Sequence, residues 1–190
     1  MTGIEEDIKR SMAVLSEGGV IIYPTDTVWG IGCDATNPEA VEKVYNIKSR
    51  NGNRSLIVLV NGLTMLERYV KEIPGIAYEL TEISDSPLTI IYPDGKNLAK
   101  GIYAGDNSVA IRICNEQFCN ELISRFRRPL VSTSANISGK PYPSNFEEID
   151  PDLLKNADYV VSYRRDDYKK YTPSPVIRVE YNGVINIIRK

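Results

Sequence analysis

Histidine is absent from this chain of 190 residues. Its absence excludes Ser–His and Cys–His nucleophilic pairs, a histidine general base and most zinc hydrolase sites. The three cysteines form no Cys-x-x-Cys pair, which argues against a disulfide framework or a zinc site and favours a reducing compartment; they are Cys33, Cys114 and Cys119. Any chemistry must therefore use lysine, arginine, carboxylates, hydroxyls, backbone amides or a carboxylate-bound metal.

Long apolar runs and an excess of basic charge are also missing. No apolar stretch approaches the roughly 20 residues that cross a bilayer, and the acidic, amphipathic start MTGIEEDIKRSMAVL does not resemble a signal peptide. The formal net charge is −2, with 42% hydrophobic and 25% charged residues, as in soluble globular proteins. We therefore expect a cytoplasmic protein without membrane contact, in which a local basic patch would bind any polyanion.

The spacing of apolar residues predicts the secondary structure. Helices are predicted over 4–16, 37–48, 63–83 with an interruption at Pro74, 115–127 and 145–157. Strands are predicted at 18–24, 55–60, 87–93, 108–113, 129–134, 159–163, 175–181 and 183–189. Asn182-Gly183 is typical of a type I′ hairpin between the last two strands.

The order of these elements predicts the fold class. Strands alternate with helices early in the chain and cluster late, which favours a mixed sheet with helices against it. We therefore expect a single domain over residues 1–190 of the α+β (mixed α/β) class. The polar segment 164–174 is expected to be a mobile surface loop rather than a linker, because the hairpin after it needs a sheet to pack on.

Two polar segments early in the chain indicate an anion site. Residues 24–32 (PTDTVWGIG) follow a buried strand, and such turns expose backbone N–H groups that hold phosphate or carboxylate. Lys48, Arg50 and Arg54 lie between a helix end and the next strand, an arrangement that suits a polyphosphate. An ordinary turn and a solvated helix cap are the alternatives.

Two later segments have the same character. Along 108–113 side chains alternate, so Arg112 shares a face with Ser108, opposite to the apolar positions, and is either exposed or directed into a cleft. Residues 132–139 (STSANISG) place several hydroxyls and an amide at a strand end, where a capping turn is the alternative. All four segments together point to a site.

At these residues the chain resembles the YrdC family of threonylcarbamoyl-adenylate synthases, which begin the t6A modification of tRNA. The resemblance extends over nearly the whole chain, and its motifs are the GG-strand-PTDT-x-W/Y-G-x-G segment at 18–32, Lys48-x-Arg50, PLT at 87–89, VAIR at 109–112 and STSANISGKP at 132–141. It implies a twisted mixed sheet of the YrdC/RibB type, flanked by helices, with a central basic cavity. The implied activity is a nucleotidyl transfer that converts L-threonine, bicarbonate and ATP into threonylcarbamoyl-AMP and pyrophosphate.

The resemblance also implies individual roles. Lys48 and Arg50 would be the catalytic cations. The ATP-binding residues would be Lys48, Arg50, Arg54, Ser108, Ser134, Asn136 and Arg189. Threonine would be held by Thr27, Arg112, Ser132 and Ser174, with Arg112 on its carboxylate. No protein metal site is expected, since Mg²⁺ would be held chiefly through the ATP phosphates; the expected partners are tRNA or double-stranded RNA and the enzymes of the later tRNA-modification step.

The chain departs from the family pattern at several positions. The family commonly has proline after Lys-x-Arg and Lys-Pro further on, where this chain has Asn51 and Arg54-Ser55. The late Ser-Thr pair of the family reads Ser174-Pro175 here. A histidine that some members carry on the strand after Lys-x-Arg has no counterpart, and we expect none of the additional C-terminal domain of longer members.

The residue inventory suits this reaction and leaves other functions open. Threonine and bicarbonate give a carbamate that displaces pyrophosphate at the α-phosphorus, so the site needs positioning and charge neutralisation but no nucleophile. Asp26 either contacts a metal or braces its turn. One alternative is a non-catalytic RNA-binding module that uses Lys48, Arg50, Arg54 and residues 164–170, which the net charge disfavours as the sole function. The other is a related enzyme acting on another substrate.

Overall fold

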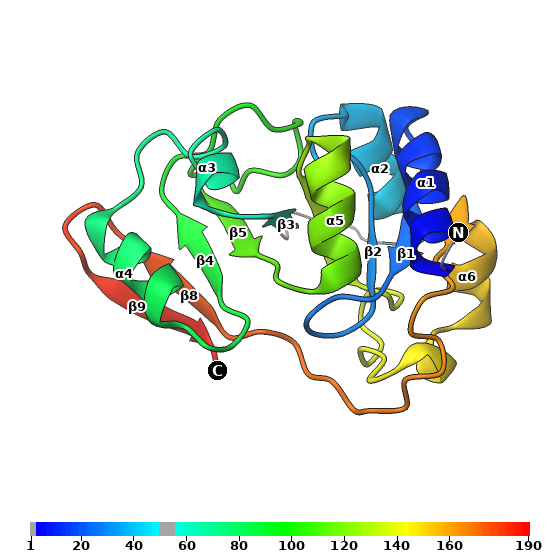
Figure 1. Cartoon of the computed structure of the whole chain (residues 1–190). Helices are drawn as coiled ribbons and strands as arrows, with labels where there is room; N and C mark the ends of the chain where they lie inside the picture. Colours follow the sequence, from blue (N-terminus) through cyan, green and yellow to red (C-terminus); the bar gives the residue numbers. More distant parts are fainter. Residues whose placement is uncertain (1–2, 50–55) are drawn as a thin grey trace.

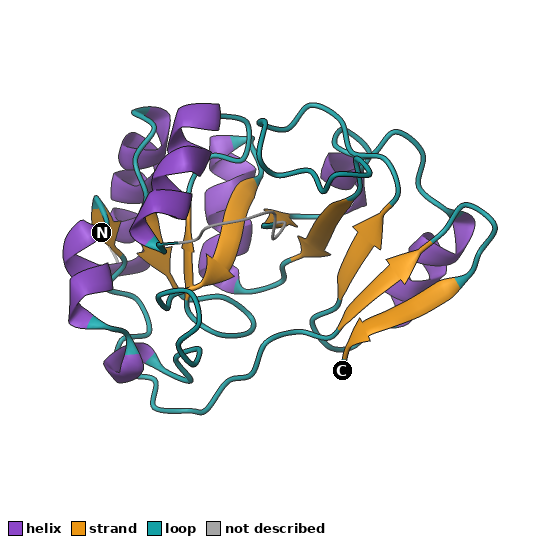
Figure 2. Ribbon diagram, turned by 180° about the vertical axis from the view of Figure 1, so that it is seen from behind, coloured by secondary structure: helices purple, strands orange, loops and turns teal. Residues whose placement is uncertain are grey.

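The computed structural model of the chain describes residues 3–49 and 56–190. Within these residues, nine strands form one sheet in the order β7-β1-β2-β6-β3-β5-β4-β8-β9. The pairs β1–β7, β3–β5 and β4–β8 are parallel and the other neighbours are antiparallel. The structure confirms the predicted mixed sheet with helices against it (Figures 1 and 2).

The strands are short. Their bounds are β1 Ile21–Tyr23, β2 Gly30–Gly32, β3 Ile57–Val60, β4 Thr89–Tyr92, β5 Val109–Ile113, β6 Leu130–Ser134, β7 Tyr159–Val160, β8 Val176–Val179 and β9 Ile185–Arg189. In Figure 1 the hairpin of β8 and β9 lies at one end of the molecule, and β1 lies near the other end with the amino terminus. Residues from both halves of the chain therefore meet in the centre of the sheet, where β6, β3 and β5 are neighbours.

The helices lie along the whole sheet. Their bounds are α1 Gly3–Ser16, α2 Pro38–Ile47, α3 Leu63–Leu66, α4 Gly75–Ile83, α5 Gln117–Phe126 and α6 Pro151–Asn156, with a 3-10 turn at Phe146–Glu148. Helix α3 packs against the central strands β3 and β5, and α5 lies in front of the middle of the molecule in Figure 1. The start of α2 confirms the prediction, because the Asn37 side chain accepts a hydrogen bond from the Ala40 N–H at 3.0 Å. None of the helices described is long and apolar enough to cross a membrane.

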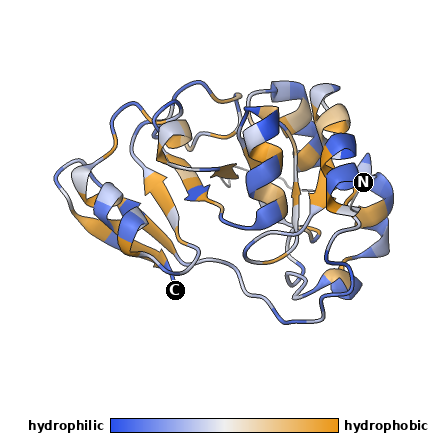
Figure 3. Cartoon of the chain, in the orientation of Figure 1, coloured by the Kyte–Doolittle hydropathy of each residue, from blue (hydrophilic) through white to orange (hydrophobic). Residues whose placement is uncertain are grey.

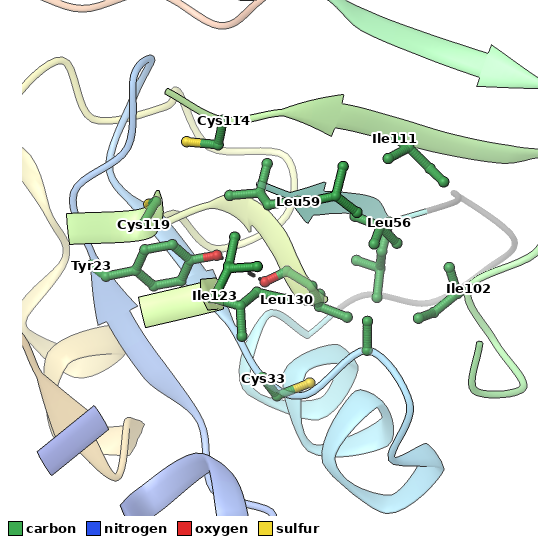
Figure 4. Packing of buried hydrophobic residues seen from close by; sticks show 14 of the residues in the cluster. Tyr23, Cys33, Leu56, Leu59, Ile102, Ile111, Cys114, Cys119, Ile123 and Leu130 are labelled. Atoms are coloured by element: carbon green, nitrogen blue, oxygen red, sulfur yellow. Dashed lines mark hydrogen bonds between the residues drawn. The ribbon is translucent and has the colours of Figure 1, made fainter. Parts of the chain in front are cut away.

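One buried cluster of apolar side chains joins the sheet to its helices. Figure 3 shows hydrophobic colour along the strands and hydrophilic colour on the outer turns of α5. Tyr23, Leu59, Ile123 and Leu130 belong to this cluster and are all fully buried (Figure 4). Cys33, Cys114 and Cys119 are buried and free. Burial of the apolar side chains in this cluster supplies most of the driving force for folding.

Strand β2 was not among the predicted strands, and glycine explains both its presence and the failure to predict it. Gly32 lies so close to β6 that a Cβ atom would collide with the carbonyl oxygen of Val131. Tyr23 reaches over β2 and donates its hydroxyl proton to the same oxygen at 3.0 Å. A Gly-Ile-Gly strand has no apolar alternation to detect, so the sequence indicated only a turn over 24–32.

The predicted helix over 63–83 is wrong in its middle part. Helix α3 ends at Leu66, and α4 begins only at Gly75. Between them the backbone pairs with a distant segment: the Lys71 N–H donates to Asp94 at 2.9 Å and the Lys96 N–H donates to Tyr69 at 2.9 Å. These long-range hydrogen bonds replace the helical ones.

Two further differences lie near the end of the chain. Only Gly183, with φ 83°, is left-handed at the final turn, whereas a type I′ turn needs Asn182 to be so as well. The Gly183 N–H donates to Glu180 at 3.0 Å and the Glu180 N–H to Val184 at 2.9 Å, which makes a three-residue loop. Strand β7 ends at Val160 rather than 163, because the buried Asp7 carboxylate of α1 accepts the Tyr163 N–H, which would otherwise continue the ladder, as well as the Ser162 N–H.

Candidate active site

The end of α2 and the end of β6 meet at Lys48, whose side chain is buried. Its ammonium nitrogen donates to the carbonyl oxygens of Ser134 at 2.5 Å and Asn136 at 2.6 Å, and to the Asn136 Oδ1 at 3.3 Å. The Ser134 hydroxyl donates to the same Oδ1 at 2.5 Å. The structure therefore brings together Lys48, Ser134 and Asn136, which the sequence places far apart.

A second cluster forms around Arg112 on β5, which is only 4% exposed. Its Nη2 lies 3.0 Å from the Asp26 Oδ1, and its Nη1 donates to the Ser174 hydroxyl at 3.4 Å. Its buried Nε–H has no hydrogen-bond partner among the described residues. Thr89, directly opposite Arg112 on β4, shares a hydrogen bond of 2.7 Å with the Ser174 hydroxyl. Of the two options for Arg112, burial of the side chain rules out the exposed one.

Arg189 on β9 adds a second guanidinium to this cluster. Its Nε and Nη2 donate to the Ser174 carbonyl at 3.1 and 2.7 Å. Partial desolvation and the nearby positive charge of Arg112 lower the pKa of Arg189 from its usual value. A bound anion would relieve the repulsion between these two cations. Arg189, predicted from the resemblance to bind ATP, thus lies with Arg112 and Ser174, which were predicted to bind threonine.

Asp26 braces the cluster through its ion pair with Arg112. The side chain is 13% exposed, and its Oδ1 is buried against the guanidinium. The described residues contain no group of three or more histidine, cysteine or acidic side chains that could hold a metal ion. The ion pair with the buried Arg112 favours the bracing interpretation of Asp26.

Thr27 lies in the turn before strand β2, and Ser132 lies on the neighbouring strand β6. Thr27 is nearly buried, with its hydroxyl oxygen 3.0 Å from that of Thr25. A Cβ at Gly30 would lie 2.9 Å from the Ser132 hydroxyl and 3.4 Å from the Thr25 methyl group. Glycine at position 30 therefore leaves room for the strand-end hydroxyls to approach the Thr25–Thr27 turn.

Ser108 is not brought into either cluster. It precedes Arg112 by four residues along extended chain, a separation of roughly 13 Å at 3.3 Å per residue. Its buried hydroxyl donates to the Asp106 Oδ1 at 2.6 Å and, with its own backbone N–H, lowers the pKa of Asp106 to about 2. Asp106 in turn pairs with Arg178 at 2.8 Å. Arg50 and Arg54 lie outside the described residues, so their roles stay predictions.

The connection from β7 to β8, which contains the segment predicted as a mobile loop, runs as a long loop in Figure 2 and is hydrogen-bonded to site residues near both of its ends. Ser174 is buried under the two arginines. Arg164, which has a left-handed backbone, donates to the Thr25 carbonyl at 3.1 Å and lies 5.0 Å from the ring centre of Tyr171. Sequence reasoning missed Arg164, and also Thr89, which the PLT motif contained.

A cavity of about 410 Å³ opens beside Asp26. Its polar wall contains Thr25, Asp26, Glu116, Arg164 and Tyr171, and its apolar wall contains Ile111 and Ile113. Since Ile111 and Ile113 alternate with Arg112 along β5, this wall lies on the opposite face of the strand from the guanidinium. Burial raises the pKa of the Glu116 carboxyl.

The fold of this chain is shared with known proteins. Residues 13–190 match the model of a family described as telomere recombination, with the label Sua5, YciO and YrdC. The chain belongs to the Sua5/YciO/YrdC family. The match confirms the resemblance noted in the sequence and includes the residues of both clusters.

Two curated relatives in this family extend over most of the chain. A putative threonylcarbamoyl-AMP synthase of Methanocaldococcus jannaschii is 36% identical over 96% of this chain and 87% of its own length. A threonylcarbamoyl-AMP synthase of Stenotrophomonas maltophilia is 33% identical over 97% of this chain and 98% of its own. Among solved structures, Sua5 of P. abyssi in complex with L-threonine superposes with a TM-score of 0.82 at 28% identity, covering 94% of this chain. The match covers 52% of that Sua5 chain.

Proposed function

We propose that this member of the Sua5/YciO/YrdC family is a threonylcarbamoyl-AMP synthase. It would take L-threonine, bicarbonate and ATP and release threonylcarbamoyl-AMP and pyrophosphate, which makes it a nucleotidyltransferase. The observation that carries the proposal is the buried Arg112, which retains an unpaired donor beside a second guanidinium. Such a pair suits a small carboxylate, and a relative of this fold is known with L-threonine bound.

The Arg112 cluster would bind the amino acid. One carboxylate oxygen would accept from the Arg112 Nε–H, while Asp26 and Ser174 hold the rest of the guanidinium in place. The hydroxyls of Thr27 and Ser132 would approach the remainder of the amino acid. Fixing the carboxylate leaves the amino group free to form the carbamate with bicarbonate, with loss of water.

The turn after β6 would bind the nucleotide phosphates, together with Arg50 and Arg54. The carbamate oxygen would then attack the α-phosphorus and pyrophosphate would leave, so the protein's task is alignment and stabilisation of negative charge. The lack of a three-ligand cluster among the described residues is compatible with Mg²⁺ that enters with ATP and is held through its phosphates. Bound in this way, Mg²⁺ would neutralise part of the charge of the leaving pyrophosphate.

The product is a mixed anhydride that must be consumed by an acyl transfer. We expect this transfer to be the later step of tRNA modification, carried out by partner enzymes.

The test is pyrophosphate release from ATP by the purified protein. We expect release only when threonine and bicarbonate are both present. Omitting threonine, omitting bicarbonate and replacing L-threonine with D-threonine are the controls. Equal turnover without threonine would disprove the proposed reaction while leaving the fold untouched.

A further inference from the structure

Lys48 is bonded in a way that does not fit a ligand of phosphate. An ammonium group has three N–H donors and no acceptor. Three oxygens converge on its nitrogen within 3.3 Å, and two of them are backbone carbonyl oxygens. The side chain is buried. A phosphate oxygen could reach this nitrogen only by displacing one of these acceptors and leaving it unpaired, which is unfavourable.

The hydrogen bonds of Lys48 fix the direction in which the peptide groups of the turn over residues 134–140 point. Lys48 holds this turn twice, since its own carbonyl oxygen accepts from the Ser138 N–H at 3.0 Å. C=O and N–H point in opposite directions across a trans peptide. With the Asn136 carbonyl directed at Lys48, the Ile137 N–H must point away from it. Among the described residues the N–H groups of Ile137 and Gly139 donate to no acceptor.

The conformation of the turn suits an anion. Gly139 is left-handed with φ 87° and exposed, and alternation of right- and left-handed residues gathers backbone N–H groups into a concavity for anions. The Asn136 side chain is already committed, because its Nδ2 donates to the Lys140 carbonyl at 2.6 Å.

We propose that Lys48 is a positioning residue, which holds the 134–140 turn by its carbonyl oxygens so that the N–H groups of Ile137 and Gly139 bind the polyphosphate. The proposal rests on the proposed function only in taking the polyphosphate to be that of ATP. It reassigns Lys48 from contacting phosphate to acting through the turn. Its positive charge remains near the phosphate but makes no hydrogen bond to it.

The deciding variants are Lys48→Met, Lys48→Arg and Lys48→Ala. Arginine keeps the charge and its donors, but a planar guanidinium cannot serve three oxygens that converge on one point. We therefore expect Lys48→Arg and Lys48→Met to lower the affinity for inorganic triphosphate and for ATP by a similar factor, about tenfold or more. The affinity for threonine should change by less than about twofold. Added n-propylammonium should partly restore triphosphate binding to Lys48→Ala, since it fills the space of the missing side chain.

The matched control is Lys43→Met. Lys43 lies on the same helix, and its ammonium also donates to a carbonyl oxygen, that of Gly18 at 2.9 Å, but away from the turn. We expect this variant to bind both ligands like the parent. Binding is measured by calorimetry, and melting temperature is recorded for every variant.

Hydrogen–deuterium exchange on the unmodified protein gives a reading that does not depend on any variant folding. Inorganic triphosphate should slow amide exchange in the segment 135–141. The proposal would be overturned if Lys48→Arg kept its triphosphate affinity within twofold while Lys48→Met lost it. That result would show a direct contact between the Lys48 charge and the phosphate. Unchanged binding in all Lys48 variants, or no protection of 135–141, would overturn it too. Triphosphate binding without threonine-dependent turnover would instead refute the proposed function alone.

Discussion

Lys48 and Arg112 are both buried cations in the centre of the protein, and they differ in how many of their donors are used. The Lys48 ammonium donates to three oxygens of the 134–136 turn. Arg112 contacts Asp26 and Ser174 but keeps a buried Nε–H that nothing in the described chain accepts. The two side chains are almost equally buried, so the number of donors left over is what would separate a structural cation from one that binds a ligand.

The largest expected effect comes from Arg112. If its spare donor binds the threonine carboxylate, Arg112→Lys should fail as Arg112→Ala does, because one ammonium cannot reproduce the planar fork. We expect threonine affinity to fall about ten- to hundredfold in both variants, as for loss of a charged hydrogen bond. Threonine is titrated at saturating ATP. A loss confined to ATP affinity would move Arg112 to the phosphate site and remove the contrast with Lys48.

Asp7 is a buried anion that can be compared with Lys48, because both of its carboxylate oxygens accept hydrogen bonds. Burial raises the pKa of its carboxyl, but hydrogen bonds from Tyr159, Ser162 and Tyr163 outweigh burial and lower it overall. Because the pKa of Asp7 is lower in the folded protein, its ionised carboxylate stabilises the fold fully above the unfolded-state pKa of about 3.9. This stabilisation is lost as the pH falls through the folded-state pKa. Asp7→Asn should therefore lower the free energy of unfolding by about 1–3 kcal/mol at pH 7, and the difference should shrink in acid.

Urea unfolding at pH 7 and at a series of acidic pH values measures this difference. Asp152→Asn is the control, since that side chain is 77% exposed. A pH-independent difference between the parent and Asp7→Asn would contradict the assignment.

Part of this comparison could be foreseen from the sequence. Lys48, Ser134 and Asn136 belong to local motifs at a helix end and a strand end, so their character was visible without the fold. The resemblance also grouped Arg112 with Ser174, but the contacts of this pair with Asp26 and Thr89 were not foreseen, because Asp26 comes from the turn after β1 and Thr89 from β4. Strand β2 escaped prediction because Gly30 and Gly32 carry no pattern, and Asp7 because its partners lie more than 150 residues away.

A smaller effect is expected from Ser174→Ala, which removes the hydroxyl between Arg112 and Thr89. The Arg189 contact is to the Ser174 carbonyl oxygen and would remain. We expect threonine affinity to fall about three- to tenfold, the size of a neutral hydrogen bond. Thr172→Ala, at an exposed position of the same segment, is the control. An effect as large as that of Arg112→Ala would mean that Ser174 itself holds the substrate.

The smallest effect concerns Ser108, which the resemblance assigns to ATP and the structure bonds to Asp106. Ser108→Ala should raise the pKa of Asp106 from about 2 towards 3.8, since the hydroxyl is the main cause of the lowering. Stability should change by less than about 1 kcal/mol, because Asp106 is largely exposed. Carboxyl titration by NMR measures the pKa. A raised KM for ATP in the same variant would support the nucleotide role, and unchanged kinetics would argue against it.

The position of Ser174 and Arg189 along the chain has a consequence for synthesis on the ribosome. Ser174 lies just before the β8–β9 hairpin and Arg189 lies on its last strand, and this hairpin completes the sheet beside β4. Domains generally fold as units during translation, yet Arg112 cannot contact Ser174, nor Ser174 its partner Arg189, until these residues have left the exit tunnel. A nascent chain stalled before that point would have the Lys48 turn but an unfinished Arg112 cluster. The two clusters are therefore completed at different stages of synthesis, and only the Lys48 turn can form before the β8–β9 hairpin is made.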